Sequence, residues 1–341
     1  MRNKNVREIA KRIGVSPASV SRYLSGYNYV SNEMKFKIQM ALDELEKDKA
    51  QPINKTIIIS YILRKETFSY YSSLIDELCF LLIQNQFNVE IIPIRLDATQ
   101  QYYQKLELAT RYMCVILIGG VTPREIIKGI RRCKIPLILL DNEYYGSFSV
   151  NIDNFSGVYN AMRYLYQLGH REIAFIGASQ RRYVFYQRFL GYQIFMRQHN
   201  LEENVAFYQE CDFYTEGINM TQEVFNRAPF TALVCSGETM MIGAVSYLSS
   251  QNMQIPKDLS IISCGDTEIS RNFYPPITSL SLMKKKLSSS VLELVKQIHR
   301  GDSTPLKILI WPELICRQSC RSLLLESSQL PSRQDNDESP M

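Results

Sequence analysis

The first 40 residues concentrate side-chain chemistry that suits nucleic-acid binding. They hold eight Lys and Arg against Glu8 and Glu33, a net charge of +6, whereas the other 301 residues carry a net charge of −1. A basic block on a near-neutral body is the electrostatic footprint of a nucleic-acid-binding head. Within this block, Arg22 can form forked hydrogen bonds to guanine O6 and N7. Because charge alone equally fits a solvated basic face, the apolar pattern must decide.

The apolar spacing of residues 1–47 predicts three short helices. Residues 6, 9, 10 and 13 form one apolar helix face, and Gly14 ends that helix. Ser16 suits the N-cap and Pro17 the first position of a second helix, which turns residues 20 and 24 inward. Ser31 is predicted to cap a third helix with residues 34, 38, 42 and 45 on one side. A helix, a tight turn and a second helix can present the second helix to the DNA major groove.

The string of residues 6–26 resembles the head of the lactose/galactose repressor family of bacterial transcriptional regulators. Its specific part is A-x-x-x-G-V-S-x-x-[ST]-V-S-R-x-L-[NS]-G, here residues 10–26. The resemblance places Pro17 and Ala18 at the two base-reading positions, with Arg22 one turn later. Ser16, Ser19 and Ser21 are candidates for phosphate contacts, which position a head without specifying sequence. Ser19 and Ser21 could instead satisfy the helix backbone.

The linker, residues 48–55, departs from the family pattern. Family members follow the third helix with Y-x-P-N-x-x-A-R-x-L, a segment that wedges an apolar side chain into the minor groove. Here only ten residues separate Leu45 from Thr56, and Pro52 and Asn54 are the only echo of that segment. We therefore expect a polar linker that inserts no wedge. Ile53, the only apolar candidate for the wedge, is predicted to be the first core residue of the body.

Residues 56–325 alternate short β-branched runs with helical patterns, which favours α/β architecture with parallel, doubly wound sheets. Ligands of such folds bind beyond the carboxyl ends of the strands. The body resembles the periplasmic-binding-protein-like core of the same repressors, through strings such as Leu168–Gly177 and Ile255–Ile262. The resemblance implies an effector-binding and dimerisation domain whose chain crosses three times between two subdomains, near 148–153, 266–275 and 308–314.

The expected domain organisation follows from these segments. It comprises a helix-turn-helix head (1–47), the linker (48–55), an effector domain (56–325) and a disordered tail (326–341). Within the effector domain, one subdomain is expected to take 56–150 and 276–308. The other is expected to take 151–275 and 309–325.

The resemblance also assigns effector-binding positions. Asp141, at a strand end, matches a carboxylate that accepts sugar hydroxyls, and Arg188 matches an arginine that clamps the effector. Phe213 matches an aromatic residue that stacks on the ligand, and Tyr70 and Tyr71 lie where the family has two aromatic residues at the pocket mouth. An aromatic face with a few fixed polar groups is what a sugar pocket needs. Asp141 could instead cap the next turn, and Phe213 could belong to the core.

Two effector positions break the family pattern. Where the family has Asn-Asp before a helix, this chain has Gly237-Glu238, and the family turn G-F-D-D is here Ser-Cys-Gly-Asp, ending at Asp266. Glu238 and Asp266 remain candidate effector contacts. The lost hydroxyl partners should change the ligand or weaken hexose binding.

The residue pattern does not indicate an enzyme, a metal site or a cofactor site. The three His (170, 199 and 299) form no zinc-binding motif, and neither a G-x-S-x-G elbow nor a P-loop is present. Eight scattered Cys suggest reduced thiols, and Cys316 and Cys320 have no further ligands at zinc spacing. No apolar run approaches bilayer length, and the amino terminus lacks an apolar signal region. We expect a cytoplasmic protein without a catalytic site, cofactor, metal or membrane contact.

These patterns predict a ligand-controlled transcriptional regulator, a repressor of a carbohydrate-utilisation operon. Its expected partners are pseudo-palindromic operator DNA, a second copy of the chain and a small carbohydrate effector. One alternative is a sugar-binding scaffold of the same fold whose head no longer reads DNA. Another is an exported binding protein, against which the basic head and the missing signal region argue.

Overall fold

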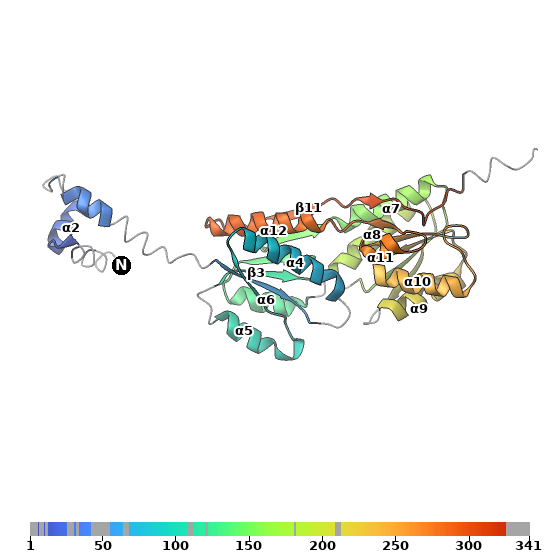
Figure 1. The fold of residues 1–341 in the computed structure, drawn as a ribbon, viewed down its shortest axis with the longest axis horizontal. Helices are drawn as coiled ribbons and strands as arrows, with labels where there is room; N and C mark the ends of the chain where they lie inside the picture. Colours follow the sequence, from blue (N-terminus) through green and yellow to red (C-terminus); the bar gives the residue numbers. More distant parts are fainter. Residues whose placement is uncertain are drawn as a thin grey trace, which may run out of the picture. The chain divides into compact units, whose positions relative to one another are not determined.

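The computed structural model describes residues 6, 10, 13–25, 31, 34–41, 55–63, 68–107, 112–119, 122–180, 182–208 and 213–324. The chain forms two compact units, Met1–Asn54 and Lys55–Met341 (Figure 1). The predictions for the linker, for Ile53 and for the tail 326–341 fall outside the described residues. The side chain of Tyr70 also falls outside them.

The head contains the predicted recognition helix, α2 (Pro17–Leu24). Gly14 adopts φ +69, which a helix C-terminus favours, and Ser16 caps α2 by accepting a hydrogen bond from the Ser19 backbone N–H at 3.2 Å. The prediction that Leu24 points inward is wrong, because it is the last residue of α2 and is 49% exposed. The small core gathers instead around four buried residues: Ala10, Val20, Ile38 and Ala41.

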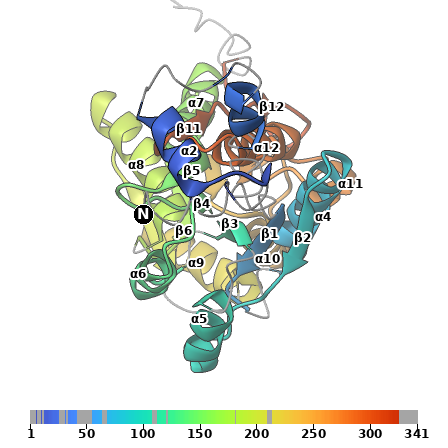
Figure 2. The same ribbon diagram turned by 90° about the vertical axis from the view of Figure 1, so that its left-hand side faces the viewer.

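The first subdomain has a six-stranded parallel sheet in the order β11-β5-β4-β3-β1-β2. Its helices cover both faces, as the continuous apolar runs of buried parallel strands require. Helices α4 and α12 pack on one face, and α5 and α6 on the other (Figures 1 and 2). The elements are β1 (Thr56–Tyr61), α4 (Phe68–Gln84), β2 (Asn88–Ile91), a 3-10 turn η1 (Leu96–Ala98), α5 (Thr99–Glu107), β3 (Tyr112–Ile118), α6 (Arg124–Arg132), β4 (Leu137–Leu140), β5 (Phe148–Ile152), α12 (Lys284–His299) and β11 (Lys307–Ile310).

The second subdomain repeats this design with the order β12-β10-β9-β8-β6-β7, in which only β12 runs antiparallel to its neighbour. Helices α7 and α8 cover one face, and α9 and α10 the other. The elements are α7 (Asn154–Gln167), β6 (Ile173–Ala178), α8 (Tyr183–Gln198), β7 (Asn204–Tyr208), α9 (Phe213–Arg227), β8 (Ala232–Cys235), α10 (Glu238–Ser250), β9 (Ser260–Cys264), α11 (Glu268–Asn272), β10 (Thr278–Leu280) and β12 (Leu314–Ile315).

The chain crosses between the two sheets three times, and the crossing segments hydrogen-bond to one another. The Asp153 N–H donates to the Ile310 carbonyl at 2.9 Å, and the Ser281 N–H donates to the Glu313 carbonyl at 2.8 Å. The prediction that the second crossing lies at 266–275 is wrong. Strand β10 pairs with β9 in the second sheet, so the chain leaves that sheet only after Leu280. Strands β5 and β11 likewise end at 152 and 310, beyond the expected limits of 150 and 308.

Candidate recognition helix and effector site

Helix α2 presents one exposed face that suits base contact. Pro17, Ala18, Ser21 and Arg22 are all exposed, while Val20 is buried on the opposite side. The hydroxyls of Ser16 and Ser19 are 2.9 Å apart and hydrogen-bonded, and Ser16 also caps the helix. The predicted phosphate-contacting serines therefore divide into a capping pair and the exposed Ser21. Arg22 is the side chain of this face with the reach and the donors for a base edge.

We expect Arg22→Ala to weaken specific operator binding by about 1–3 kcal/mol, the contribution of a lost bidentate base contact. Fluorescence anisotropy with the chain's own promoter region and with a random duplex measures the effect. Lys37→Ala, at an exposed cation of the third helix, is the charge-matched control. An equal loss on both duplexes would mean that Arg22 contacts only phosphate.

Asp141 lies directly after β4 and is the buried acidic group of the candidate effector site. It is 6% exposed, and its backbone adopts φ +58, a left-handed conformation that Asp tolerates better than most residues. Burial raises the pKa of its carboxyl to about 6, and the nearby Arg188 guanidinium opposes that rise. The structure therefore brings Asp141 of the first subdomain within electrostatic range of Arg188 of the second.

Arg188, in the first half of α8, is held rigidly. Its Nε donates to the Asn154 side-chain oxygen at 2.7 Å, and one terminal nitrogen donates to the Ser236 carbonyl at 2.6 Å. The residue is 8% exposed. Two fixed partners orient the planar guanidinium, so its remaining donors have a defined direction. Such preorganisation suits a ligand that presents paired acceptors.

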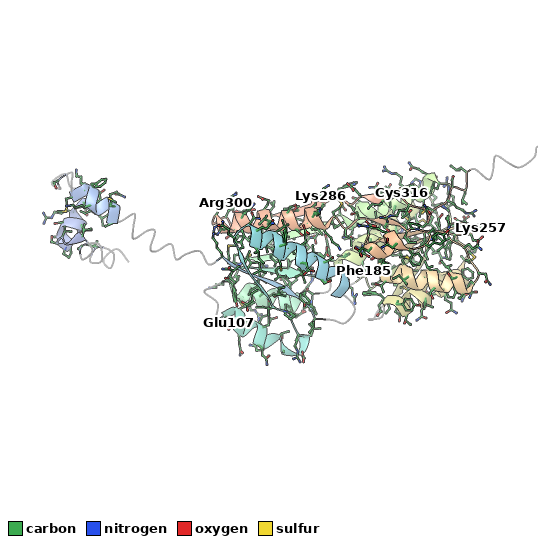
Figure 3. The ribbon with its side chains drawn as sticks, viewed as in Figure 1. Glu107, Phe185, Lys257, Lys286, Arg300 and Cys316 are labelled. Carbon is green, nitrogen blue, oxygen red and sulfur yellow. The ribbon has the colours of Figure 1, made fainter. Side chains whose placement is uncertain are left out.

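Aromatic rings gather beside Arg188. Its guanidinium carbon lies 5.6 Å from the centre of the Phe185 ring, and that ring centre lies 6.1 Å from that of Phe213. Phe185 lies on the side of the second subdomain that faces the first (Figure 3). In the first subdomain, the Tyr71 hydroxyl lies 3.7 Å from the position a Cβ would take on Gly119, at the end of β3. Phe213 is half-buried and packs against the core of the second subdomain, and its stacking role stays a prediction.

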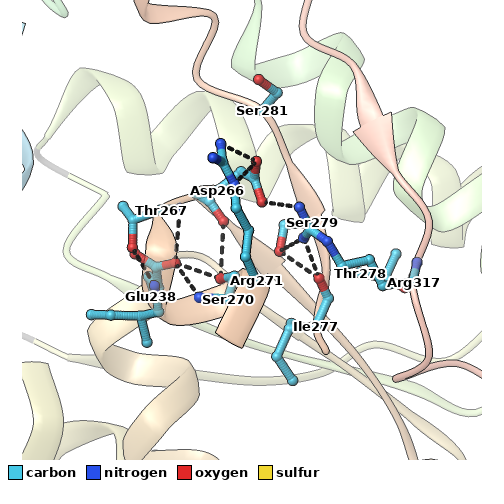
Figure 4. Close-up of polar contacts among 12 residues, drawn as sticks. Glu238, Asp266, Thr267, Ser270, Arg271, Ile277, Thr278, Ser279, Ser281 and Arg317 are labelled. Carbon is cyan, nitrogen blue, oxygen red and sulfur yellow. Dashed lines mark hydrogen bonds and ion pairs between the residues drawn. The ribbon is translucent and has the colours of Figure 1, made fainter. Parts of the chain in front are cut away.

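Glu238, at the start of α10, is engaged within the second subdomain. Its carboxylate accepts hydrogen bonds from the backbone N–H groups of Thr267 and Ser270, each at 3.1 Å, and from both their hydroxyls (Figure 4). It therefore satisfies the amino-terminal turn of α11. Its contact with an effector stays a prediction. Such a contact would require the effector to replace Thr267 or Ser270 as the hydrogen-bond donor to this carboxylate.

Asp266 is also engaged, by two arginines. One carboxylate oxygen lies 2.6 Å from a terminal nitrogen of Arg317, and the other lies 3.0 Å from one of Arg271 (Figure 4). The Asp266 side chain is only 2% exposed. A buried carboxylate with both oxygens paired to arginine is a structural ion pair, and its predicted contact with an effector would compete with these partners.

Polar contacts between the two subdomains flank the site. Glu143, which follows β4, lies 2.7 Å from the Lys307 ammonium of the same subdomain and hydrogen-bonds to the Tyr183 hydroxyl of the other. Lys284, at the start of α12, donates to the Ser73 hydroxyl at 2.5 Å. Burial lowers the pKa of Lys284, and the Glu238 carboxylate across the subdomain boundary opposes that fall. The Glu143–Tyr183 hydrogen bond and the Lys284–Glu238 attraction cross the subdomain boundary, whereas the contacts of Glu143 with Lys307 and of Lys284 with Ser73 lie within the first subdomain. Subdomain closure can make or break the two that cross.

Sequence reasoning missed the residues that hold the predicted ones in place. Asn154 and Ser236 fix Arg188, and Arg317 fixes Asp266. Asn154 and Arg317 end the stretches 150–154 and 313–317, which also resemble the core of these repressors. No local pattern predicts which distant side chain each of them contacts. Ser236 acts through its backbone carbonyl, for which side-chain type gives no signal.

The residues that the structure describes carry neither a metal site nor a membrane-spanning helix. Among them, no group of three or more His, Cys, Asp or Glu is placed to hold a metal ion. None of the helices described has the length and apolar character that spanning a bilayer requires.

Comparison with known proteins matches both parts of the chain. Residues 5–46 match the family described as bacterial regulatory proteins, lacI family, and residues 162–320 match the periplasmic binding protein-like domain. A relative named HTH-type transcriptional repressor PurR, from Histophilus somni (strain 2336), is 26% identical and is covered to 99%, with 93% of this chain covered. The Haemophilus influenzae protein of the same name is 24% identical, with 94% of this chain and 99% of the relative covered.

Solved structures share the fold. A transcriptional regulator CelR–cellobiose complex has a TM-score of 0.71 at 19% identity, covering 92% of this chain and 99% of that one. The lac repressor dimer bound to operator and the anti-inducer ONPF also has a TM-score of 0.71, at 18% identity, covering 92% of this chain and 98% of that one.

A helix-turn-helix head joined to a two-subdomain binding core defines a DNA-binding transcriptional regulator and not an enzyme. The chain thus combines a head that matches the lacI family of bacterial regulatory proteins with a periplasmic binding protein-like domain.

Proposed function

We propose that this chain is a cytoplasmic repressor controlled by a small effector bound between its two subdomains. Two heads of a two-fold dimer bind a pseudo-palindromic operator through α2. The observation that carries the effector site is the proximity of Asp141 and Arg188, two buried and opposite charges from different subdomains. A ligand that engages both prefers one arrangement of the subdomains, which is the differential affinity that control requires.

A sugar-like effector is the first candidate. Asp141 supplies an acceptor for hydroxyls, Arg188 supplies fixed donors, and Phe185 with Phe213 supplies an apolar ring surface. The operon under control would then serve carbohydrate use. Since Glu238 and Asp266 are engaged by other residues, few acceptors remain for a molecule with many hydroxyls.

A purine base is the second candidate, favoured by two observations. The relatives named PurR cover 93% of the chain at 26% identity. A flat ring with few polar groups also suits a site with paired aromatic rings and a small number of fixed polar groups. Calorimetry of the full chain against a panel of sugars and purine bases separates the two candidates.

We expect Arg188→Ala to abolish the response to the effector while operator binding stays near wild type. A buried polar group left without its partner costs about 1–3 kcal/mol, enough to remove a coupling of similar size. Calorimetry measures effector affinity, and anisotropy with operator DNA measures the response. Arg197→Ala is the matched control, because Arg197 lies on the same helix, is 63% exposed and pairs with Glu203. Unchanged effector affinity in Arg188→Ala would place the pocket elsewhere.

The alternative, a sugar-binding scaffold whose head does not read DNA, predicts a different result. Such a protein would bind effector and show no preference for its own promoter region over random duplex. The exposed face of α2, with Arg22 on it, supports operator binding.

A further inference from the structure

We propose that a second pocket, at the amino-terminal edge of the first sheet, binds a small phosphate monoester. The pocket has a volume of about 250 Å³ and lies where β4 and β5 begin, at Leu137 and Phe148. Asp141 follows the opposite end of β4. The two sites therefore lie at opposite edges of one sheet, and this pocket is separate from the proposed effector site.

The charge of the pocket favours an anion. Arg131 and Lys134 line it, and no carboxylate is among its lining residues. Arg131 is fixed in place, since one terminal nitrogen donates to the Tyr145 carbonyl at 2.9 Å and the guanidinium carbon lies 5.3 Å from the centre of the Tyr144 ring. The two positive charges repel each other, and an anion bound between them would relieve that repulsion. Both groups are strong hydrogen-bond donors to phosphate oxygens.

Hydroxyls and apolar groups define the ligand further. The Ser147 hydroxyl is buried without a hydrogen-bond partner in the part of the chain that the structure describes, which is costly unless a ligand supplies one. Rotation about χ1 gives this hydroxyl a second direction, and Ser303 lies in the same lining. Ile135 and Pro305 add apolar surface. A phosphate with a small apolar substituent matches this combination, because the volume lies below the roughly 300 Å³ at which pockets for larger ligands begin.

The phosphate group has two conceivable sources, a free monoester and a DNA backbone. The apolar lining favours the monoester, because a phosphate of the DNA backbone is flanked by polar sugars and by further charged phosphates. Phenyl phosphate and inorganic phosphate are suitable probes for the first source, and a random DNA duplex is the probe for the second.

Calorimetry of the full chain tests the proposal. We expect saturable, one-to-one binding of phenyl phosphate, weakened about tenfold or more by Lys134→Gln and by Ser147→Ala. Ser147→Ala should leave thermal stability unchanged or higher, because it removes an unpartnered buried hydroxyl. Lys128→Gln and Arg132→Gln are matched controls, since both residues are exposed cations on α6 outside the pocket lining, and they should bind phenyl phosphate like wild type.

Three outcomes would overturn the proposal. The first is that neither phenyl phosphate nor inorganic phosphate shows saturable binding. The second is an equal loss in the control variants, which would indicate diffuse charge and no site. The third is a selective loss of duplex affinity in Lys134→Gln without phenyl phosphate binding, which would assign the pocket to DNA. Because Arg188→Ala leaves this pocket intact, phenyl phosphate binding should survive it even if the proposed effector site is wrong.

Discussion

Asp141→Asn should stabilise the effector-free protein by about 3 kcal/mol above pH 6. Burial raises the pKa of the Asp141 carboxyl from 3.8 to about 6, so folding favours its protonated form. A group whose pKa rises on folding contributes to the free energy of unfolding. This contribution is complete below the pKa of the unfolded state and is lost as the pH rises through the pKa of the folded state. Each unit of pKa corresponds to about 1.4 kcal/mol. The neutral amide escapes this penalty, and Asn tolerates the φ of +58 at this position.

Denaturant unfolding at several pH values measures this effect. The gain from Asp141→Asn should be near zero at about pH 4 and should grow to its full size above about pH 6. The same variant should bind effector more weakly, because an amide oxygen is a poorer acceptor than a carboxylate. A gain that is independent of pH would show that ionisation of Asp141 is not its source.

Asp302→Asn is a control in which the expected change in stability has the opposite sign. Hydrogen bonds from the Thr304 backbone and side chain, together with one from Gln297, lower the pKa of the Asp302 carboxyl. Its contribution to stability is therefore present above its unfolded pKa and is lost as the pH falls through the lower, folded value. Asp302→Asn should lose stability at neutral pH, where Asp141→Asn gains it.

Local signals in the sequence predicted much of the fold. Ser16 and Pro17 predicted the start of α2 correctly, because a helix cap forms between residues that are close together in the sequence. The apolar β-branched runs predicted buried parallel strands, since a strand covered by helices on both faces needs no polar side. The crossing that the family resemblance places at 266–275 lies later in the chain, beyond β10. Pairing with β9, which is distant in sequence, decides where Thr278 lies.

The effector site was predictable only in its individual positions. Family-like strings marked Arg188 and Asp141, but their mutual proximity depends on the packing of two subdomains. Nor could the strings show that the carboxylates of Glu238 and Asp266 are already engaged. Thr267 lies 29 residues beyond Glu238, and Arg317 lies 51 residues beyond Asp266. Side-chain type identifies what a residue can bind, whereas long-range contacts decide what it does bind.

Arg317→Ala should destabilise the protein by about 3–5 kcal/mol, the usual cost of removing one partner from a buried ion pair. The Arg317 side chain is 16% exposed and contacts the 2% exposed carboxylate of Asp266 at 2.6 Å. It also donates to the Ile277 carbonyl at 2.6 Å, so its loss leaves two buried acceptors without this donor. Arg317 follows β12, and these bonds tie that edge strand to the loop before α11.

Arg271→Ala provides the matched comparison, because Arg271 contacts the same carboxylate from a side chain that is 57% exposed. An exposed partner contributes only about 0–1 kcal/mol, since water replaces it and solvent screens its charge. Urea unfolding of the two variants at neutral pH should therefore give clearly different midpoints with similar slopes. Equal losses would show that burial does not distinguish the two arginines, and the Asp266 carboxylate would then be solvated enough to accept an effector hydroxyl after all.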